Sequence, residues 1–135
     1  MVSDFRKLNT LIQRKIYPLP KIQDVLHRRS GYKYFTKLDI SMQYYTFGLD
    51  EESSNLCVIV TPFGKFRYKC LPMGICQSTD IAQEIMEHVF HDMDDIKCFL
   101  DDIGIFSNSY EEHMVTIRTV LMHLQHNNFS VNPLK

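Results

Sequence analysis

The sequence predicts an α+β fold in which an antiparallel sheet carries helices packed on one face. Short apolar runs separated by turn residues indicate strands joined by hairpins. Two longer segments carry apolar residues at helical spacing, which indicates amphipathic helices. The chain has 135 residues, 44% of them hydrophobic, and no internal repeat or low-complexity tract. It is therefore long enough for one domain with a real core.

The charge of the chain is unevenly distributed although its formal net charge is only -1. Residues 1–37 hold nine basic groups against two acidic ones, and residues 80–113 hold ten acidic groups against Lys97 alone. A basic arm and an acidic centre suit a protein that grips a polyanion and concentrates cations nearby. Two solvated faces of opposite sign explain the pattern about equally well.

Several classes of protein are not expected. No run of about 18 apolar residues is present, so no membrane span is predicted. The N-terminus lacks the apolar core of a signal peptide. The four cysteines show no CxxC spacing, which favours free thiols in a reducing compartment over a zinc site.

The N-terminal third begins with residues 4–9, for which we expect a strand end that leads into a loop. Pro18 and Pro20 exclude a helix before them, because proline disfavours helical backbone in the preceding residue. Pro20 suits the first turn of a helix, and Gly31 is the residue expected to end it.

Four further segments follow in the middle of the chain. Residues 34–40 alternate as a strand does, so that Leu38 and Ile40 share one face and Phe35 and Lys37 the other. We expect a strand over residues 44–49, an acidic loop over 50–52 and a central strand over 56–60, where β-branched residues are frequent.

The next segments predict a hairpin and then a helix. Residues 62–65 form the turn, and residues 66–69 the returning strand. A rigid turn at residues 71–74 precedes a helix that Ser78 or Thr79 is expected to cap. Apolar residues at helical spacing continue that helix as far as Phe90.

The last part of the chain contains two apolar runs, at residues 96–100 and 103–106, which predict a tight hairpin with Asp101 and Asp102 at its tip. Ser109 is expected to cap a long helix that ends at residues 127–128, and residues 129–132 predict one more strand.

Three carboxylates attract attention within these elements. Asp101 and Asp102 are adjacent, and two close acidic groups repel unless a cation lies between them. Hard carboxylate oxygens suit Mg²⁺. Asp39 lies on a strand between apolar neighbours, where a charge is costly unless it is paired or metal-bound. Taken singly, a polar turn and a strand-end cap explain these residues better.

Five segments of the chain favour a metal site over these simpler explanations, because together they resemble one family. They are Asp4-Phe5-Arg6-Lys7-Leu8-Asn9, Tyr17-Pro18-Leu19-Pro20, Leu38-Asp39, Leu71-Pro72-Met73-Gly74 and Phe99-Leu100-Asp101-Asp102. Their order and approximate spacing resemble the reverse transcriptase of gypsy-like long-terminal-repeat retrotransposons, over essentially the whole chain. The resemblance implies a polymerase palm with a ferredoxin-like or RRM-like core and the end of the fingers over residues 1–135. Thumb, connection and RNase H would lie outside.

The resemblance implies an RNA-directed DNA polymerase that uses two Mg²⁺ ions about 3.5–4 Å apart, with Mn²⁺ able to substitute. Asp39, Asp101 and Asp102 match the catalytic carboxylates, and the backbone carbonyl of Ile40 would join them as a metal ligand. Tyr44 would select deoxyribose by excluding a 2′-hydroxyl, unless it is only a core tyrosine. Met73 and Gly74 would lie along the incoming nucleotide.

Further roles follow from the same resemblance. The residues expected to contact nucleic acid are Arg6, Lys7, Arg14, Lys15, Gln77 and Gln83, and Lys135 is a candidate general acid. The implied partners are an RNA or DNA template with its primer, deoxynucleoside triphosphates and the remainder of a retroelement polyprotein. The implied location is a cytoplasmic retroelement particle with access to the nucleus, and no membrane.

Some positions depart from the family pattern. Phe99 stands where tyrosine is commoner, and Gln43 stands where glycine is usual. Neither change removes a carboxylate, but both suggest that selection on the sequence of the site is relaxed. The alternative is therefore a truncated, catalytically inactive retroelement remnant that at most binds nucleic acid or divalent metal.

Overall fold

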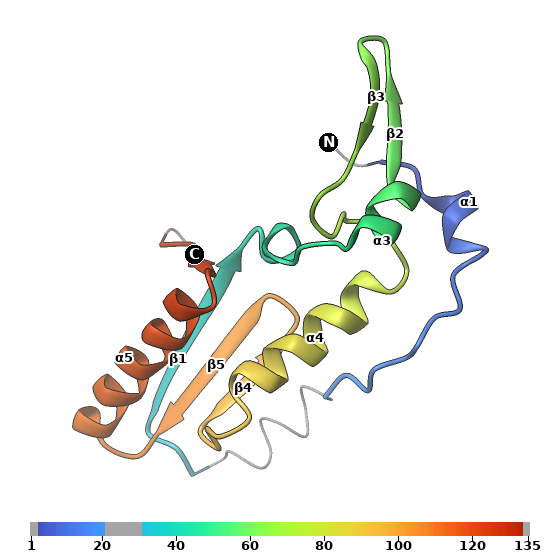
Figure 1. The fold of residues 1–135 in the computed structure, drawn as a ribbon. Coiled ribbons are helices and arrows are strands. Elements are labelled where there is room, and N and C mark those ends of the chain that lie inside the picture. The colour runs from blue at the N-terminus through green and yellow to red at the C-terminus, as the bar shows by residue number, and fades with distance from the viewer. Residues whose placement is uncertain (1–2, 21–30, 134–135) are drawn as a thin grey trace.

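The computed structural model describes residues 3–20 and 31–133. Its main sheet has four strands in the order β4-β5-β1-β6, and every neighbouring pair is antiparallel (Figure 1). The strands are β1 (Tyr34–Ser41), β4 (Ile96–Phe99), β5 (Asp102–Ser107) and β6 (Ser130–Val131). The expected antiparallel sheet is confirmed.

Two long helices, α4 (Ser78–Val89) and α5 (Tyr110–His126), cover one face of this sheet (Figure 1). The core lies between them and the strands. Its innermost members are Ile103, Ile105, Met86, Val120 and Leu124. Burying these side chains supplies the main stabilisation, at roughly 1.5–3 kcal/mol for each large apolar residue. The expected packing of helices on one face is also confirmed.

Within residues 3–20 and 31–133, no helix covers the other face of the sheet (Figure 1). Leu38 and Ile40 of β1 pack into the core, so the alternation of the strand turns Lys37 and Asp39 to the opposite side. Residues paired across antiparallel strands share a face, and Asp39 is paired with Asp102. The acidic residues therefore project from the open face.

A second, smaller unit contains α1 (Arg6–Asn9), α3 (Glu51–Leu56) and a two-stranded hairpin of β2 (Val58–Thr61) and β3 (Gly64–Arg67). It has its own small core of Phe5, Cys57 and Ile75, against which Tyr68 packs. The hairpin projects from the molecule (Figure 1).

Residues 44–49 do not form the expected strand. Met42 adopts a left-handed backbone with φ of 51°, which ends the extended run of β1. A short 3-10 helix, η1 (Gln43–Thr46), follows and buries Gln43. The prediction failed because Tyr44 and Tyr45 favour strands by propensity, and tertiary packing overrides that preference.

Two expectations in the middle of the chain are wrong. Asp50 is an N-cap, because its side chain accepts a hydrogen bond from the Ser53 N–H at 2.7 Å, and the residues expected to form an acidic loop begin α3. The run at residues 56–60 is not a central strand. Its last residues belong to β2, which pairs only with β3 among the described residues and leaves Val60 74% exposed.

The remaining elements are partly as expected. Residues 6–9 form a helical turn instead of a strand end. The helix expected over residues 20–31 falls largely on 21–30, outside the described residues. Gln77, not Ser78 or Thr79, occupies the N-cap of α4, and Ser109 caps α5 as predicted. In the described parts of the chain, no helix is long and apolar enough to cross a membrane. All four cysteines are free thiols.

Candidate functional site

Three carboxylates meet at one end of the open sheet face. Asp39 on β1 lies directly opposite Asp102 on β5, and the Ile40 N–H donates to the Asp101 carbonyl at 2.8 Å. Asp39 is only 8% exposed, whereas Asp101 is exposed at the turn. The hairpin and the neighbouring strand therefore bring together all three acids that the sequence singled out.

Asp102 forms an ion pair with Lys37. The Lys37 Nζ lies 2.9 Å from the Asp102 Oδ2, across the strand pair. The hydrogen bond to Asp102 and the charge of that carboxylate raise the pKa of Lys37. Lys37 therefore offsets part of the negative charge at the site, and it engages Asp102 specifically.

The turn before Asp101 is held through its backbone. Leu100 has a φ of 54°, an unusual value for a residue other than glycine, asparagine or aspartate. Its N–H donates to the Gln83 Oε1 at 2.9 Å, and its carbonyl accepts from the Gln43 Nε2 at 3.3 Å. Two glutamine side chains from separate helices thus hydrogen-bond to the backbone of Leu100, the residue directly before Asp101.

Gln83 is fully buried, which contradicts its expected contact with nucleic acid. Its Nε2 donates to the Cys98 carbonyl at 3.0 Å and to the Glu87 Oε1 at 2.8 Å. The polar atoms of the side chain are thus hydrogen-bonded within the protein. Its role in this structure is to join α4 to the end of β4.

Gln43 is almost as deeply buried, at 2% exposure. Among the described residues its Oε1 has no hydrogen-bond partner. A buried polar atom without a partner costs free energy, on the order of 1–3 kcal/mol. Gln43 therefore bears this cost beside the turn that precedes Asp101.

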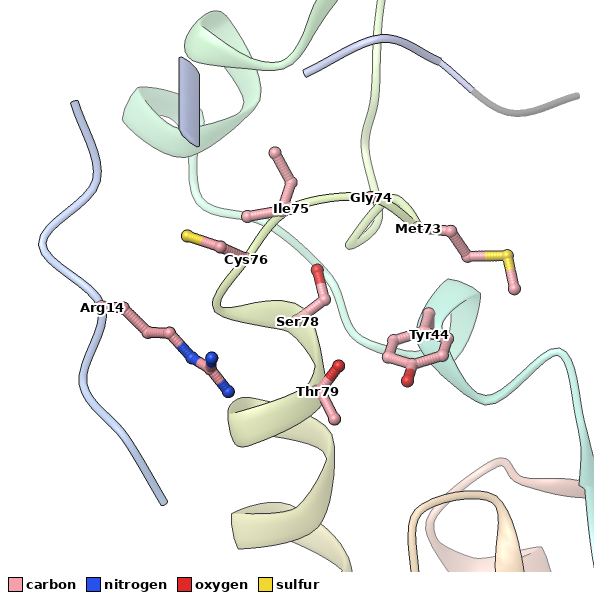
Figure 2. A pocket seen from close by; sticks show the side chains of 8 residues that line it. All are labelled: Arg14, Tyr44, Met73, Gly74, Ile75, Cys76, Ser78 and Thr79. Carbon is pink, nitrogen blue, oxygen red and sulfur yellow. The ribbon is translucent and has the colours of Figure 1, made fainter. Parts of the chain in front are cut away.

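A pocket of about 380 Å³ lies between η1 and the start of α4 (Figure 2). Its lining comes from the N-terminal arm, η1, the turn at residues 71–74 and the start of α4. The lining residues are Arg14, Tyr44, Met73, Gly74, Ile75, Cys76, Ser78 and Thr79. The structure thus brings together the three residues expected to contact a nucleotide, and Tyr44 is half-buried at the pocket wall instead of in the core.

Gly74 is needed for the shape of this pocket. Its φ is 98°, a backbone conformation that side chains with a Cβ rarely adopt. The turn also lies close to the N-terminal segment, because the Asn9 Nδ2 donates to the Gly74 carbonyl at 2.8 Å. This contact ties the turn to α1.

The N-terminal arm is fastened to α4 by its polar groups. The Gln77 side-chain amide exchanges two hydrogen bonds of 2.7 Å with the Lys15 backbone. The Arg14 Nε lies 2.7 Å from the Asp80 Oδ2, and the Tyr17 N–H donates to Asp80 at 2.9 Å. The Arg14 hydrogen bond, followed by the Tyr17 N–H, lowers the pKa of Asp80.

These contacts separate the basic residues expected to bind nucleic acid into two groups. Arg6 and Arg14 form ion pairs with Asp4 and Asp80, so their charges are partly offset. The side chains of Lys7 and Lys15 are exposed. Gln77 is engaged with the arm, and Lys135, the candidate general acid, lies outside the described residues.

The carboxylates do not form a preassembled metal cage. Among the described residues, no three His, Cys, Asp or Glu side chains gather closely enough to hold an ion. Mg²⁺ usually takes one or two carboxylates and completes its shell with water and substrate phosphates. Asp39 and Asp101 therefore fit an ion that shares its ligands with a substrate.

Comparison with known families decides the assignment. The sequence profile described as "Reverse transcriptase (RNA-dependent DNA polymerase)" matches residues 1–135. The chain belongs to the reverse transcriptase family. The gypsy-like resemblance agrees with this assignment, and the three acids lie at the motifs that first suggested it.

Relatives of this reverse transcriptase segment are parts of polyproteins. The Tf2-3 transposon polyprotein of Schizosaccharomyces pombe is 31% identical over 137 residues, which cover 100% of the chain and 10% of the polyprotein. The Pol polyprotein from the transposon opus of Drosophila melanogaster is 31% identical over 134 residues, or 98% of the chain and 13% of that protein. The chain thus spans a small part of each.

Solved structures share the fold. The foamy viral protease-reverse transcriptase in complex with an RNA/DNA hybrid superposes with a TM-score of 0.88, at 17% identity, over 96% of the chain and 18% of that protein. A second structure of that enzyme, in complex with double-stranded DNA, gives a TM-score of 0.91 at 18% identity, over 98% of the chain and 23% of that protein. The palm expected from the sequence is therefore confirmed as the fold.

Proposed function

We propose that this reverse transcriptase segment is the palm of an RNA-directed DNA polymerase, with the end of the fingers within residues 1–135. The observation that carries the proposal is the pairing of Asp39 with Asp102 beside the Asp101 turn. Two acids from separate strands can clamp cations from both sides, as nucleotidyl transfer requires. The reaction joins a primer 3′-oxygen to the α-phosphorus of a deoxynucleoside triphosphate and releases pyrophosphate.

The residues at the carboxylate site would have two roles, metal binding and tuning of the local charge. Asp39, Asp101 and the Ile40 carbonyl would hold Mg²⁺, or Mn²⁺ in its place. When bound, two such ions would lower the pKa of the primer hydroxyl and offset the charge of the leaving pyrophosphate. Asp102, paired with Lys37, would tune the site without needing to touch an ion.

The pocket would receive the nucleotide. Met73 and Gly74 would lie along the base and template, and Tyr44 would stand against the sugar, where its ring excludes a 2′-hydroxyl. Arg14 lines the same pocket, and its guanidinium is held in place by Asp80. A fixed guanidinium is suited to a phosphate oxygen.

A primer and an RNA or DNA template would lie along the open sheet face. Lys37 and Lys97 project there, and the exposed Lys7 and Lys15 of the arm add phosphate contacts. We assign Arg6 and Gln77 a supporting role and keep Lys135 as the proposed general acid. The parent polyprotein would act in a cytoplasmic retroelement particle with access to the nucleus.

The test uses the segment within a complete polymerase, because it spans 10% to 13% of the transposon relatives described above. Residues 1–135 replace the matching segment of a related reverse transcriptase. Primer extension on an RNA template should then need Mg²⁺ and should fall by at least about a hundredfold in Asp101→Asn and Asp39→Asn, since charge stabilisation is lost. Tyr44→Ala should extend primers and incorporate more ribonucleotide.

Two outcomes would count against the proposal. A folded chimaera that binds duplex but never extends a primer would favour the inactive remnant. If the Asp101→Asn chimaera still extends primers, Asp101 is not part of the catalytic site. Glu84→Gln, on the exposed side of α4, is the matched control and should extend normally.

A further inference from the structure

The catalytic turn contains one residue whose backbone needs outside support. Leu100 lies between Phe99, the last residue of β4, and Asp101, and it adopts the left-handed conformation. A branched or bulky side chain in that conformation costs roughly 1–2 kcal/mol and persists only where contacts hold it. The Leu100 N–H has such a contact, the Gln83 Oε1 at 2.9 Å.

The Gln83 amide can make that contact only in one orientation. A glutamine side chain offers two N–H donors and one carbonyl oxygen. Both donors are used, on the Cys98 carbonyl at 3.0 Å and on the Glu87 Oε1 at 2.8 Å. A carboxylate and a backbone carbonyl can only accept hydrogen bonds, so Glu87 and the Cys98 carbonyl together keep the Nε2 on their side and turn the Oε1 toward Leu100.

Glu87 is itself held by the N-terminal arm. The Tyr17 hydroxyl donates to the Glu87 Oε2 at 2.7 Å, so each carboxylate oxygen has a separate donor. This hydrogen bond is the main reason that the pKa of Tyr17 is raised. The Tyr17 N–H also donates to Asp80, which fixes the arm beside α4.

We propose that Glu87 and Tyr17 are positioning residues for the Asp101 turn, acting through the Gln83 amide. The path is continuous: Tyr17 hydroxyl, Glu87 carboxylate, Gln83 amide and Leu100 N–H. Neither residue touches the carboxylates. The proposal deepens the proposed function, because it makes the geometry of the metal-binding acids depend on the docking of an arm on the far side of α4.

The first measurement does not depend on catalysis. Amide hydrogen exchange in the 135-residue chain compares the Leu100 N–H with the Phe106 N–H, which donates to the Asp95 carbonyl at the other end of the same hairpin. In Glu87→Met the exchange of Leu100 should accelerate about fivefold relative to Phe106, the effect of losing one ordinary hydrogen bond. Tyr17→Phe should give a smaller acceleration of the same amide.

Two further variants separate positioning from general stability. Glu87→Gln restores an acceptor for Gln83 and should return the exchange ratio to within twofold of the parent. Glu84→Met removes an exposed carboxylate from the same helix and should leave the ratio unchanged. Equal acceleration of Leu100 and Phe106 would mean a merely structural role and would overturn the proposal.

A second measurement connects the turn to the metal. Titration calorimetry with Mn²⁺ should show weaker binding in Glu87→Met, by about threefold or more, and near-parental binding in Glu87→Gln. If no variant or parent binds Mn²⁺ while the exchange effect appears, the proposed function fails and the positioning role stands. If Mn²⁺ binds equally in all variants and the exchange ratio is constant, the positioning role fails alone.

Discussion

Among the residues that the structure describes, Asp80 is the most deeply buried charged residue, with 2% of its surface exposed. Its carboxylate accepts two hydrogen bonds from Arg14 and one from the Tyr17 N–H. The pKa of Asp80 is lowered from 3.8, chiefly by the Arg14 hydrogen bond. A carboxyl whose pKa falls on folding stabilises the protein above its unfolded pKa, and the effect disappears as the pH falls through the folded value.

Asp80→Asn should therefore lower the free energy of unfolding by about 1–3 kcal/mol at pH 7. The difference from the parent should shrink below about pH 4, because the parent loses the same charge there. Urea denaturation at pH 7 and pH 3 measures both values, and Glu84→Gln is an exposed control. A loss that is equal at both pH values would show that packing, not charge, is what Asp80 provides.

Single residues were predictable from the sequence where several segments agreed. Asp39, Asp101 and Asp102 lie together as expected, but the expectation came from the resemblance of five segments in register, because each acid taken singly had a simpler structural explanation. Gln43 and Gln83 were not foreseen as supports of the turn. A glutamine leaves no pattern in the sequence, and only the fold shows which backbone group its amide meets.

Among the strands, Gly104 of β5 marks a close approach of aromatic side chains. A Cβ at this position would lie 3.1 Å from the Phe106 ring and 3.3 Å from the Phe35 ring. Phe106 is only 6% exposed and also packs edge-on against Tyr32, so it has little room to move. Glycine keeps this part of the open face flat.

Gly104→Ala should consequently destabilise the protein by about 1–3 kcal/mol, the usual range for overpacking. Urea denaturation measures the change. Gly48→Ala is the matched control, because a Cβ there meets nothing within 4 Å. Adding Phe35→Ala to the Gly104 variant should recover part of the loss. If the two glycine variants were equally stable, the rings would not be the constraint.

Elements with a clear period were predictable, and short irregular ones were not. The alternation in β1 and the apolar spacing in α4 gave the correct faces. In α5 the spacing correctly predicted that Val120 and Leu124 are buried, but it also assigned Met114 and Leu121 to that face, and both are exposed. The start of α3 had a signal that was misinterpreted: an Asp followed by two Glu residues is typical of a helix N-terminus. The break at Met42 had none, because nothing local requires its left-handed backbone.

At the scale of the whole molecule, opposite charges are held on different parts. The acids gather at the end of the open face, and the exposed Lys7 and Lys15 lie on the arm. We expect the chain to bind an RNA–DNA duplex at low salt and to release it as salt rises, because phosphate contacts release counterions. Fluorescence anisotropy at several salt concentrations measures the slope.

Changing both Lys7 and Lys15 to Ala should reduce that salt slope by about 2. Arg118→Ala alters an exposed cation on α5, which covers the opposite face of the sheet, and should leave the slope unchanged. A slope that depends on Arg118 and not on the two lysines would place the duplex on the helical side.

The pairing of β1 with β5 has a consequence for how the chain avoids misfolding. Shifting β1 by one residue would turn Phe35, Lys37 and Asp39 toward the apolar helices and move Leu38 and Ile40 into water. Burying two charges without partners is far more costly than burying none. The acid proposed for catalysis thus also disfavours the shifted strand alignment, because a chain that keeps Asp39 away from the apolar helices has already selected the register in which Asp39 pairs with Asp102.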